Sequence, residues 1–300
     1  MALQYFLLDV FADAPFQGTQ IPVVIPENPL SDNDKLLIAG EFQQTETVFL
    51  EVSDIHKPLS VYNSKKQTLF GAHTILAASY TAYEMGLTQD QGAYTSLEII
   101  QNTQPIKIFI DKSPSGIGSI QFTRILSPTI DRFVPSLSLI AKALNIDEKH
   151  LSFSKYRPMV VSVDNPTLIV PLTKAEHVLA ANLNADLWTE LLSETYATEI
   201  FLFAPKSLQD GIDFHGRMIN PHIASNVFPP IGSVLPEFVA FLAEQKETAD
   251  GTHTFSIDRG TEQTRKSVLH VEFDKKSGRN TKCRIGGHVI KMGAGTLFFP

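Results

Sequence analysis

"EFQQTETVFL", residues 41–50, has a counterpart half a chain later in "ETYATEIFLF", residues 194–203. The two stretches share a glutamate, a threonine and a second glutamate at the same spacing, namely Glu41, Thr45 and Glu46 in the first and Glu194, Thr198 and Glu199 in the second. Both continue as an apolar run of the kind that forms a buried strand. Similarity at a fixed offset is typical of a repeated structural unit, so we predict two copies of one fold.

Two helical segments support the duplication because neither has a polar face. They are "HTILAASYTAYEMG" at 73–86 and "SVLPEFVAFLAEQ" at 233–245, and each follows a turn. A helix that is apolar on every side is buried. Short strand patterns bounded by Pro, Gly, Asn or Asp fill most of the remaining chain. The sequence therefore predicts an α+β protein of two similar domains, each a curved β-sheet or barrel around a central buried helix, with a cleft between them.

Composition and charge exclude several classes of function. The 300 residues carry a net charge of −7 and are 43% hydrophobic, which is typical of a globular protein with a sizeable core. The sequence has no basic stripe of the kind that binds nucleic acid, and no apolar run approaches the roughly 20 residues that span a bilayer. The opening "MALQYFLLDVFADAPF" reads as a first strand, and the single cysteine, Cys283, fits a reducing compartment. We expect a cytoplasmic protein that binds neither nucleic acid nor membrane.

Glu46 is conspicuous because it opens an apolar strand. Side chains alternate between the two faces of a strand, so Glu46 should share a face with Val48 and Leu50, which enter the core. A carboxylate at such an edge either caps nearby backbone amides or carries out chemistry. Glu46 is therefore the first candidate for a catalytic residue.

Five motifs, spread in order over nearly the whole chain, carry a family resemblance. They are "DVFADAPFQG", "QQTETVFL", "FGAHTILAAS", "DFHGRMINPHIASNVFPPIGSV" and "CRIGGHVIKMGAGTL". In this order they resemble the PhzF family of phenazine biosynthesis-like proteins, which share the diaminopimelate epimerase fold. The resemblance implies a C-terminal strand that returns to the first domain. The expected halves are residues 1–130 joined by about 283–300, and residues 131–282, with a site in the cleft between them.

The resemblance also implies which residues form the site. The family's acid/base glutamate falls on Glu46. The Gly-His before the first central helix falls on Ala72 and His73, and the Gly-Ser before the second falls on Gly232 and Ser233. The first N–H groups of a helix are free to bind a ligand, and the helix dipole favours negative charge there. A small carboxylated substrate is the partner that this arrangement implies.

The sequence departs from the family pattern at several positions. "FPPIGS" stands where the family usually reads Asp-Pro-Ala-Thr-Gly-Ser, so Phe228 occupies the place of the aspartate and Ile231 that of the threonine. The usual Gly-Asn-Pro near the start is replaced by residues 18–20, "GTQ". We expect Phe228 to line the site beside Glu46 and His73, and the substrate to be apolar at that point. The dihydroaromatic acid of the phenazine pathway should be turned over poorly.

The implied function is isomerisation by proton transfer through one carboxylic group. Glu46 in a poorly solvated cleft can take a proton from carbon and return it at another position, provided its pKa is moved towards the working pH. This chemistry requires no metal and no organic cofactor. Epimerases of the same fold use two cysteines, whereas Cys283 is the only one here. We expect a cofactor-independent isomerase acting on a small carboxylated metabolite.

A second class of function is left open by the sequence: a non-catalytic relative that binds a small anion or a protein partner. Phe228 favours this alternative, and the retained Glu46 favours the enzyme. His73 could cap the first central helix instead of contacting substrate, and Gly232 with Ser233 could be a simple helix start, since Ser is a common N-cap. A homodimer and a monomer are equally compatible with the sequence.

Asp213, His215 and His222 suggest a metal cluster by residue type alone. "DFHGRM" alternates as a strand, which puts Asp213 and His215 on one face, whereas His222 follows a proline in a turn. We therefore predict no metal site. Glu199, the repeat counterpart of Glu46, is predicted to be a relic or a surface residue instead of a second base.

Overall fold

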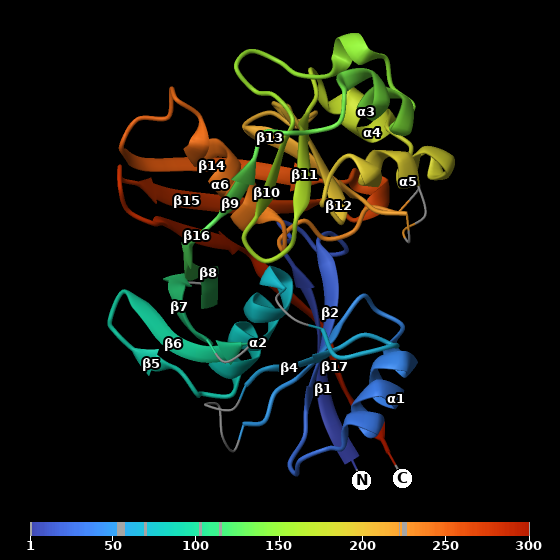
Figure 1. Ribbon diagram of the computed structural model, residues 1–300. Coiled ribbons are helices and arrows are strands. Elements are labelled where there is room, and N and C mark those ends of the chain that lie inside the picture. The colour runs from blue at the N-terminus through green and yellow to red at the C-terminus, as the bar shows by residue number, and fades with distance from the viewer. Residues whose placement is uncertain are drawn as a thin grey trace. The chain divides into compact units, whose positions relative to one another are not determined.

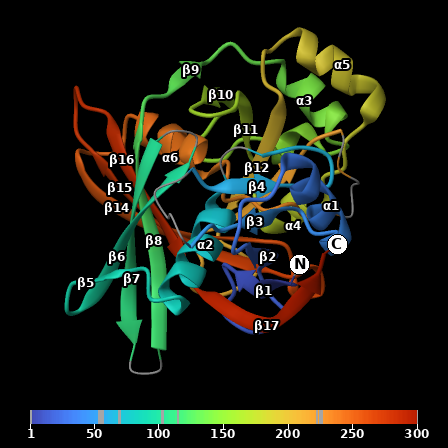
Figure 2. The ribbon, with the colours of Figure 1, turned by 90° about the horizontal axis from the view of Figure 1, so that it is seen from below.

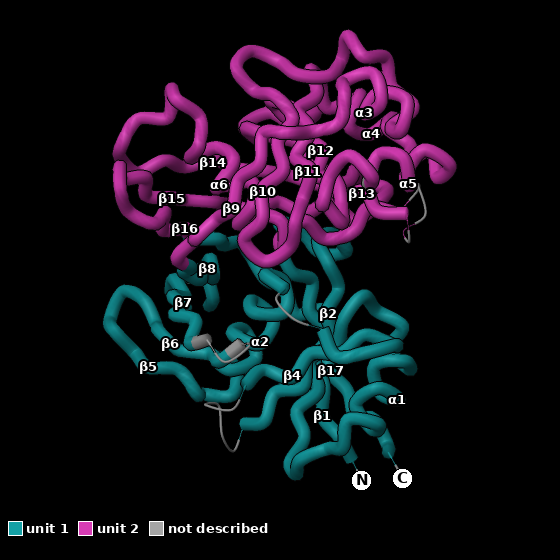
Figure 3. Tube along the Cα trace, viewed as in Figure 1, with its two compact units in different colours: residues 1–124, 284–300 teal, residues 125–283 magenta. Residues whose placement is uncertain are grey.

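The computed structural model describes residues 2–52, 58–68, 71–101, 104–113, 116–221, 223 and 227–299. The chain divides into two compact units, residues 1–124 with 284–300 and residues 125–283 (Figure 3). The first boundary lies a few residues before the expected position at 130, and the second lies close to the expected position at 282. The chain leaves unit 1 near the end of β8 (Gly116–Leu126) and returns to it within β16 (Thr281–Gly287).

Unit 1 contains a mixed sheet with the strand order β17-β1-β2-β3-β4 and a run of antiparallel strands in the order β5-β6-β7-β8 (Figure 1). These strands and the two helices of the unit have the following bounds: β1 (Ala2–Val10), β2 (Thr19–Ile25), α1 (Asp32–Phe42), β3 (Thr47–Phe49), β4 (Ser60–Tyr62), α2 (Ala72–Glu84), β5 (Gln89–Asp90), β6 (Tyr94–Gln101), β7 (Gln104–Ser113) and β17 (Val289–Phe298). The returning strand β17 pairs antiparallel with β1 along its whole length, from Ala2 with Phe298 to Val10 with Val289. The end of the chain is therefore part of the first unit.

Unit 2 has the strand order β9-β10-β11-β12-β13-β14-β15-β16. Its other elements are β9 (Thr129–Asp131), α3 (Leu137–Ala143), the short helix Glu148–His150, β10 (Met159–Ser162), β11 (Thr167–Pro171), α4 (Ala175–Ala180), α5 (Ala185–Ser193), β12 (Glu199–Pro205), β13 (Phe214–Ile219), α6 (Leu235–Glu244), β14 (Gly251–Arg259), the short helix Glu262–Thr264 and β15 (Ser267–Lys275). Helix α3 packs on α5, and α4 packs on β12 and β13. Apolar side chains of these helices and strands share one hydrophobic core.

The two units repeat one order of elements. In unit 1, β2 and β3 are parallel and are joined by α1, and in unit 2, β11 and β12 are parallel and are joined by α4 and α5. An antiparallel strand follows each pair, and then comes the helix, α2 or α6. Glu46 directly precedes β3, and Glu199 is the first residue of β12, so the two glutamates occupy corresponding positions. The predicted α+β fold of two similar domains is confirmed.

Both predicted central helices are buried. Helix α2 packs against β1, β2, β3, β6 and β17, and the views in Figures 1 and 2 place it among the strands of its unit. In α6, the ring of Phe238 contacts four phenylalanine rings from β12, β13 and β14, with centroids 4.7–5.6 Å apart: Phe201, Phe203, Phe214 and Phe255. Edge-to-face aromatic pairs of this kind add to the free energy gained by burial. Among the described residues, no helix is long and apolar enough to span a membrane.

Helix α6, although apolar on nearly every side, contains one buried carboxyl group, that of Glu237. Glu237 is 1% exposed, and its Oε1 accepts the backbone N–H groups of residues 163, 164 and 165 at 3.2, 2.8 and 3.1 Å. These bonds hold the turn between β10 and β11 against the helix. Burial raises the pKa of Glu237 from 4.5 to about 7, although the hydrogen bonds from the turn act in the opposite direction.

Glu237→Gln is expected to flatten the pH dependence of stability. A carboxyl group whose pKa is raised in the folded state stabilises that state below its unfolded pKa, and this contribution is lost as the pH rises through about 7. The raised pKa corresponds to about 3 kcal/mol of unfolding free energy. Urea unfolding at pH 4.5, 6 and 8 should show wild type losing stability relative to Glu237→Gln as the pH rises. Glu244→Gln, on the same helix but only half-buried and paired with Arg132, is the control. Equal pH dependence in all three proteins would contradict the assignment.

Candidate active site

Glu46 is buried at the entrance to β3. The three residues of that strand, Thr47, Val48 and Phe49, are buried, as is Leu50 after it. Glu46 itself is 9% exposed. Burying an ionised carboxylate costs several kcal/mol unless the charge is paired and hydrogen-bonded, so Glu46 requires a partner.

The partner of Glu46 is His73 at the start of α2. Gly71 is the N-cap of this helix, Ala72 is its first residue and His73 its second. The imidazole Nε2 of His73 lies 2.5 Å from Oε2 of Glu46, and His73 is 5% exposed. The fold thus brings together two predicted site residues that lie 27 positions apart in the sequence. The ring of His73 bonds Glu46 and does not cap the helix.

Gly71 makes this close approach possible. A Cβ atom at residue 71 would lie 2.9 Å from Oγ1 of Thr74, 3.1 Å from Oε2 of Glu46 and 3.4 Å from Cε1 of His73. The backbone of Gly71 is extended, with φ −149° and ψ 115°, so any residue could adopt its conformation. The requirement for glycine is therefore steric and comes directly from the Glu46–His73 pair.

The imidazole determines the charge of Glu46. Burial raises the pKa of Glu46, but the positive charge of His73 and its hydrogen bond lower it by more, so the pKa lies below the ordinary value of 4.5. The condition set above, a pKa of Glu46 moved towards the working pH, is not met, because the imidazole outweighs the effect of burial. At neutral pH Glu46 is ionised, which is the form that accepts a proton.

The second ring nitrogen of His73 is not used by the pair with Glu46. Nδ1 is buried and has no hydrogen-bond partner within the part of the chain that the structure describes. A buried polar atom without a partner costs about 1–3 kcal/mol. A ligand that meets Nδ1 would recover that free energy.

The predicted site residues of unit 2 lie around the start of α6. Gly232 and Ser233 form a turn, and the helix begins at Leu235 with Val234 as its N-cap and no side-chain cap. Ser233 is therefore not the N-cap but precedes it by one residue. Gly232 is buried and Ser233 is half-buried.

Phe228 lies against two arginines. Its ring faces the guanidinium of Arg217, with 4.5 Å from Cζ to the ring centroid, and its carbonyl accepts an N–H of Arg259 at 2.8 Å. Arg217 also donates to the carbonyl groups of Val178, Leu179 and Ala181 at 3.2, 2.9 and 2.8 Å, and burial lowers its pKa. The guanidinium is therefore held over an aromatic face, which is the geometry of a cation–π interaction.

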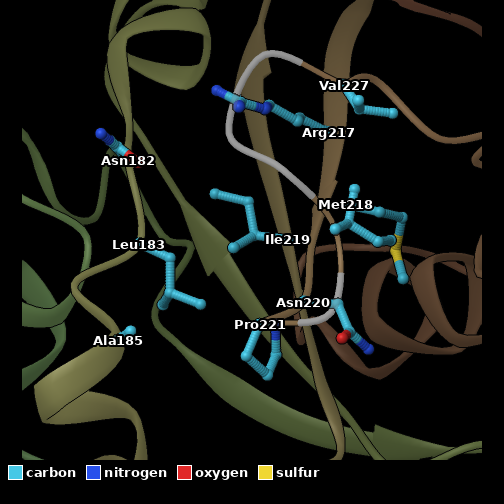
Figure 4. Close-up of a pocket in the computed structure, with 10 residues that line it drawn as sticks. Asn182, Leu183, Ala185, Arg217, Met218, Ile219, Asn220, Pro221 and Val227 are labelled. Carbon is cyan, nitrogen blue, oxygen red and sulfur yellow. The ribbon is translucent and has the colours of Figure 1, made fainter.

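A cavity of about 200 Å³ adjoins Arg217 (Figure 4). One wall comes from residues between α4 and α5, and the other from β13 and the residues after it. Figure 4 shows Leu183 and Ile219 facing each other across it, with Arg217 and Val227 at one end. No local sequence pattern predicts this cavity, because its walls come from segments more than 30 residues apart.

Glu199 has a different environment from its repeat counterpart. It is half-buried, and the hydroxyl of Thr167 donates to its Oε1 at 3.1 Å. Burial raises the pKa of Glu199, and no imidazole opposes this effect as it does at Glu46. Of the two glutamates, only Glu46 is held in an ion pair with histidine in the described structure.

Asp213 and His215, two of the residues that suggested a metal cluster, bind different partners in the structure. Asp213 accepts the N–H and the hydroxyl of Ser256, at 2.8 and 3.0 Å, while His215 pairs with Asp258. His222 lies outside the described residues. No group of three or more His, Cys, Asp or Glu side chains that could hold a metal ion occurs in the described part of the chain. Cys283 lies buried in β16.

Comparison with known proteins shows the family to which the chain belongs. The profile of the family described as "Phenazine biosynthesis-like protein" matches residues 8–295. The chain belongs to this family. Among its relatives, an "Uncharacterized isomerase" of Mesorhizobium japonicum is 24% identical over 98% of each chain, and one of Bacillus subtilis is 22% identical over 97% of this chain and 94% of the relative. The phenazine biosynthesis-like proteins are thus an isomerase-like family.

Solved structures agree on the fold of this family member. A Bacillus anthracis protein of the PhzF family matches with a TM-score of 0.84 at 18% identity, covering 100% of each chain. A hydroxyproline epimerase from Agrobacterium vitis, with bound trans-4-hydroxy-L-proline, matches with a TM-score of 0.62 at 10% identity, over 99% of this chain and 92% of that one. At these identities the likeness concerns the fold, which is the epimerase-like fold predicted from the sequence.

Proposed function

We propose that this protein is an isomerase that moves a proton on a small carboxylated metabolite, with Glu46 as the acid/base group. The observation that supports the proposal is the buried pair of Glu46 and His73, 2.5 Å apart, at the start of α2. A positioned carboxylate and imidazole in a poorly solvated place are the parts that general acid–base catalysis uses. Membership in an isomerase-like family supports the reaction class.

In the proposed reaction Glu46 alternates between base and acid. The ionised carboxylate removes a proton from a carbon made acidic by a neighbouring carboxyl or carbonyl group, and then returns the proton at another position. The Nε2–H of His73 donates to Oε2 in the resting state and keeps the carboxylate ionised. As the proton arrives on Glu46, its negative charge passes to the substrate, where donors must receive it.

The start of α2 is the proposed place for that negative charge. The first N–H groups of a helix have no partner within the helix, and its dipole favours an anion. Here these groups belong to Ala72 and His73, next to Glu46. The proposed roles of Phe228, Gly232 and Ser233 as substrate contacts stay predictions. The shared site also requires that Glu46 lie within about 10 Å of the Gly232–Ser233 turn, a limit set far above hydrogen-bond distance, and this too stays a prediction.

The proposal is tested with a panel of cyclic and amino-acid carboxylates. Each compound is incubated with the purified protein in D₂O and followed by ¹H NMR for isomer formation and for loss of a C–H signal. We expect at least one compound to react. Saturable binding without any reaction across the panel would favour the alternative, a non-catalytic relative that binds a small anion. If nothing reacts and nothing binds, the isomerase proposal fails.

His73→Asn is expected to move the acidic limb of the pH–rate profile to higher pH. Glu46 is the active base only when ionised, so activity falls as the pH falls through its pKa. Without the imidazole, burial is unopposed and the pKa of Glu46 rises. The measurement is kcat/KM against pH for wild type and variant on the same substrate. An acidic limb that stays in place would show that His73 does not set the ionisation of the base.

Phe228→Asp is expected to raise turnover of the dihydroaromatic acid of the phenazine pathway by about 10-fold or more, from a low level in wild type. An unmatched polar group typically costs about 1–3 kcal/mol, and the new carboxylate beside Arg217 would supply the missing acceptor. Phe228→Leu, which removes the ring without adding an acceptor, is the control. Robust turnover by wild type would refute the need for an aspartate, and any gain must vanish when Glu46→Gln is added.

A further inference from the structure

A second cavity, of about 530 Å³, lies in unit 2 where β13 begins. Its walls come from the segment after β12, from the first residues of β13 and from the loop between β14 and β15. The lining residues that matter here are Ser207, Gln209, His215, Asp258, Glu262 and Lys266. The volume is in the range of about 300–1,000 Å³ that is usual for small-molecule sites.

His215 and Asp258 form a buried pair in the wall of this cavity. They are register partners on the parallel strands β13 and β14, and they are 1% and 2% exposed. Nδ1 of His215 lies 2.7 Å from Oδ1 of Asp258, and the hydroxyl of Ser207 donates to Oδ2. When the ring is neutral, the proton on Nδ1 faces the carboxylate and Nε2 carries a lone pair.

Nε2 of His215 has no hydrogen-bond partner among the described residues, although it is buried. Two familiar uses of such a ring do not fit. A metal site needs further ligands, and no group of three or more candidate ligands occurs in the described part of the chain. A nucleophile triad needs its serine on the imidazole, whereas Ser207 bonds Asp258.

The charges of the lining select against anionic ligands. Lys266 is paired with Glu262 at 3.1 Å and also donates to the side chain of Gln209. With Asp258 facing His215, the lining is neutral or slightly negative. The other polar side chains of the lining carry hydroxyl and amide groups, and no Phe, Tyr or Trp stands among the described residues that form it. Neither a phosphate group nor a flat aromatic ring would find a matching partner.

We infer that this cavity binds a small neutral polyhydroxylated molecule of about monosaccharide size. One ligand hydroxyl donates to Nε2 of His215, and others exchange hydrogen bonds with Gln209 and with the hydroxyl of Ser207. The cavity beside Arg217 adjoins Ile219, four residues along the same strand, which at the usual rise is about 13 Å from His215. The two cavities therefore lie at opposite ends of β13.

The test is an NMR titration of the ¹⁵N-labelled protein that observes the imidazole signals of His215. The probes are D-glucose, D-ribose and myo-inositol, each to 50 mM, with inorganic phosphate as the anionic comparison. The signals are assigned with His215→Gln. We expect at least one polyol to shift them saturably and phosphate to leave them unchanged.

Exposed Gln209 provides the variant that leaves the core intact. Gln209→Ala should weaken binding of the active polyol by about 5-fold or more, the loss of one hydrogen bond of about 1 kcal/mol. Gln91→Ala, an exposed position in unit 1, should bind as wild type does. The inference is overturned if none of the polyols shifts the His215 signals saturably, if phosphate shifts them equally, or if Gln209→Ala binds as tightly as wild type.

Discussion

Glu46→Gln is expected to lower kcat/KM for isomerisation by at least about 100-fold, since a positioned acid/base group typically contributes 10²–10⁴-fold. The amide has nearly the shape of the carboxylate, and its oxygen can still accept the Nε2–H of His73. It cannot take up a proton, so the loss should fall on the chemical step. The measurement is the rate of isomer formation on a substrate identified with the carboxylate panel.

Glu199→Gln is the matched control for this variant. Glu199 is the first residue of β12, and Glu46 directly precedes β3. The side chain of Glu199 is half-buried. It lacks an imidazole partner and is bonded by Thr167 instead. Its replacement should leave turnover unchanged. Equal losses in the two variants would mean that a shared structural role of the repeated glutamates, and not catalysis by Glu46, explains the effect.

Gly71→Ala is expected to cost about 100-fold in turnover, because displacing a catalytic group by about 1 Å can cost that much. The added methyl would press on Oε2 of Glu46 and on Oγ1 of Thr74, at 3.1 and 2.9 Å. The carboxylate must then move away from His73. The rate is measured together with the free energy of unfolding, so that lost positioning can be separated from lost folding.

Gly40→Ala is the control for the added methyl group. Gly40 lies inside α1, and a Cβ there would meet no atom within 4 Å. Alanine should stabilise this helix by about 1 kcal/mol and leave turnover unchanged. If Gly71→Ala retains full activity, the close packing around Glu46 is not needed for function.

The architecture was predictable because two independent patterns agree. The repeated glutamate motif marks the strands β3 and β12, and the all-apolar segments mark α2 and α6. Periodicity could establish both, since a helix without a polar face must be buried and most of the remaining chain reads as strands. The exact boundaries were less accessible, because β8 and β16 run through the junctions between the units.

The candidate site was predictable only in part. Glu46 and His73 were expected from the family motif, and the fold brings them into contact. The lowered pKa of Glu46 was not expected, because a direct bond to the imidazole is a property of tertiary geometry. Gly71 could have been found, since a glycine just before a helix that carries a site residue often marks a close approach.

Other features depend on contacts that no local pattern reveals. Glu237 looks like one polar residue in an apolar helix, yet it binds the turn between β10 and β11. The cation beneath Phe228 comes from Arg217, which lies 11 positions earlier and is oriented by carbonyl groups at the end of α4. Both arrangements require strands from distant parts of the chain to be in place.

In the proposed reaction a proton passes through the carboxylate of Glu46. The most direct measurement follows the departing hydrogen of a reactive substrate in D₂O, by NMR and mass spectrometry, in wild type and in Glu46→Gln. We expect wild type to remove this hydrogen from its carbon and Glu46→Gln to leave it in place even at saturating substrate. Removal of the same hydrogen by Glu46→Gln at the wild-type rate would contradict the proposal.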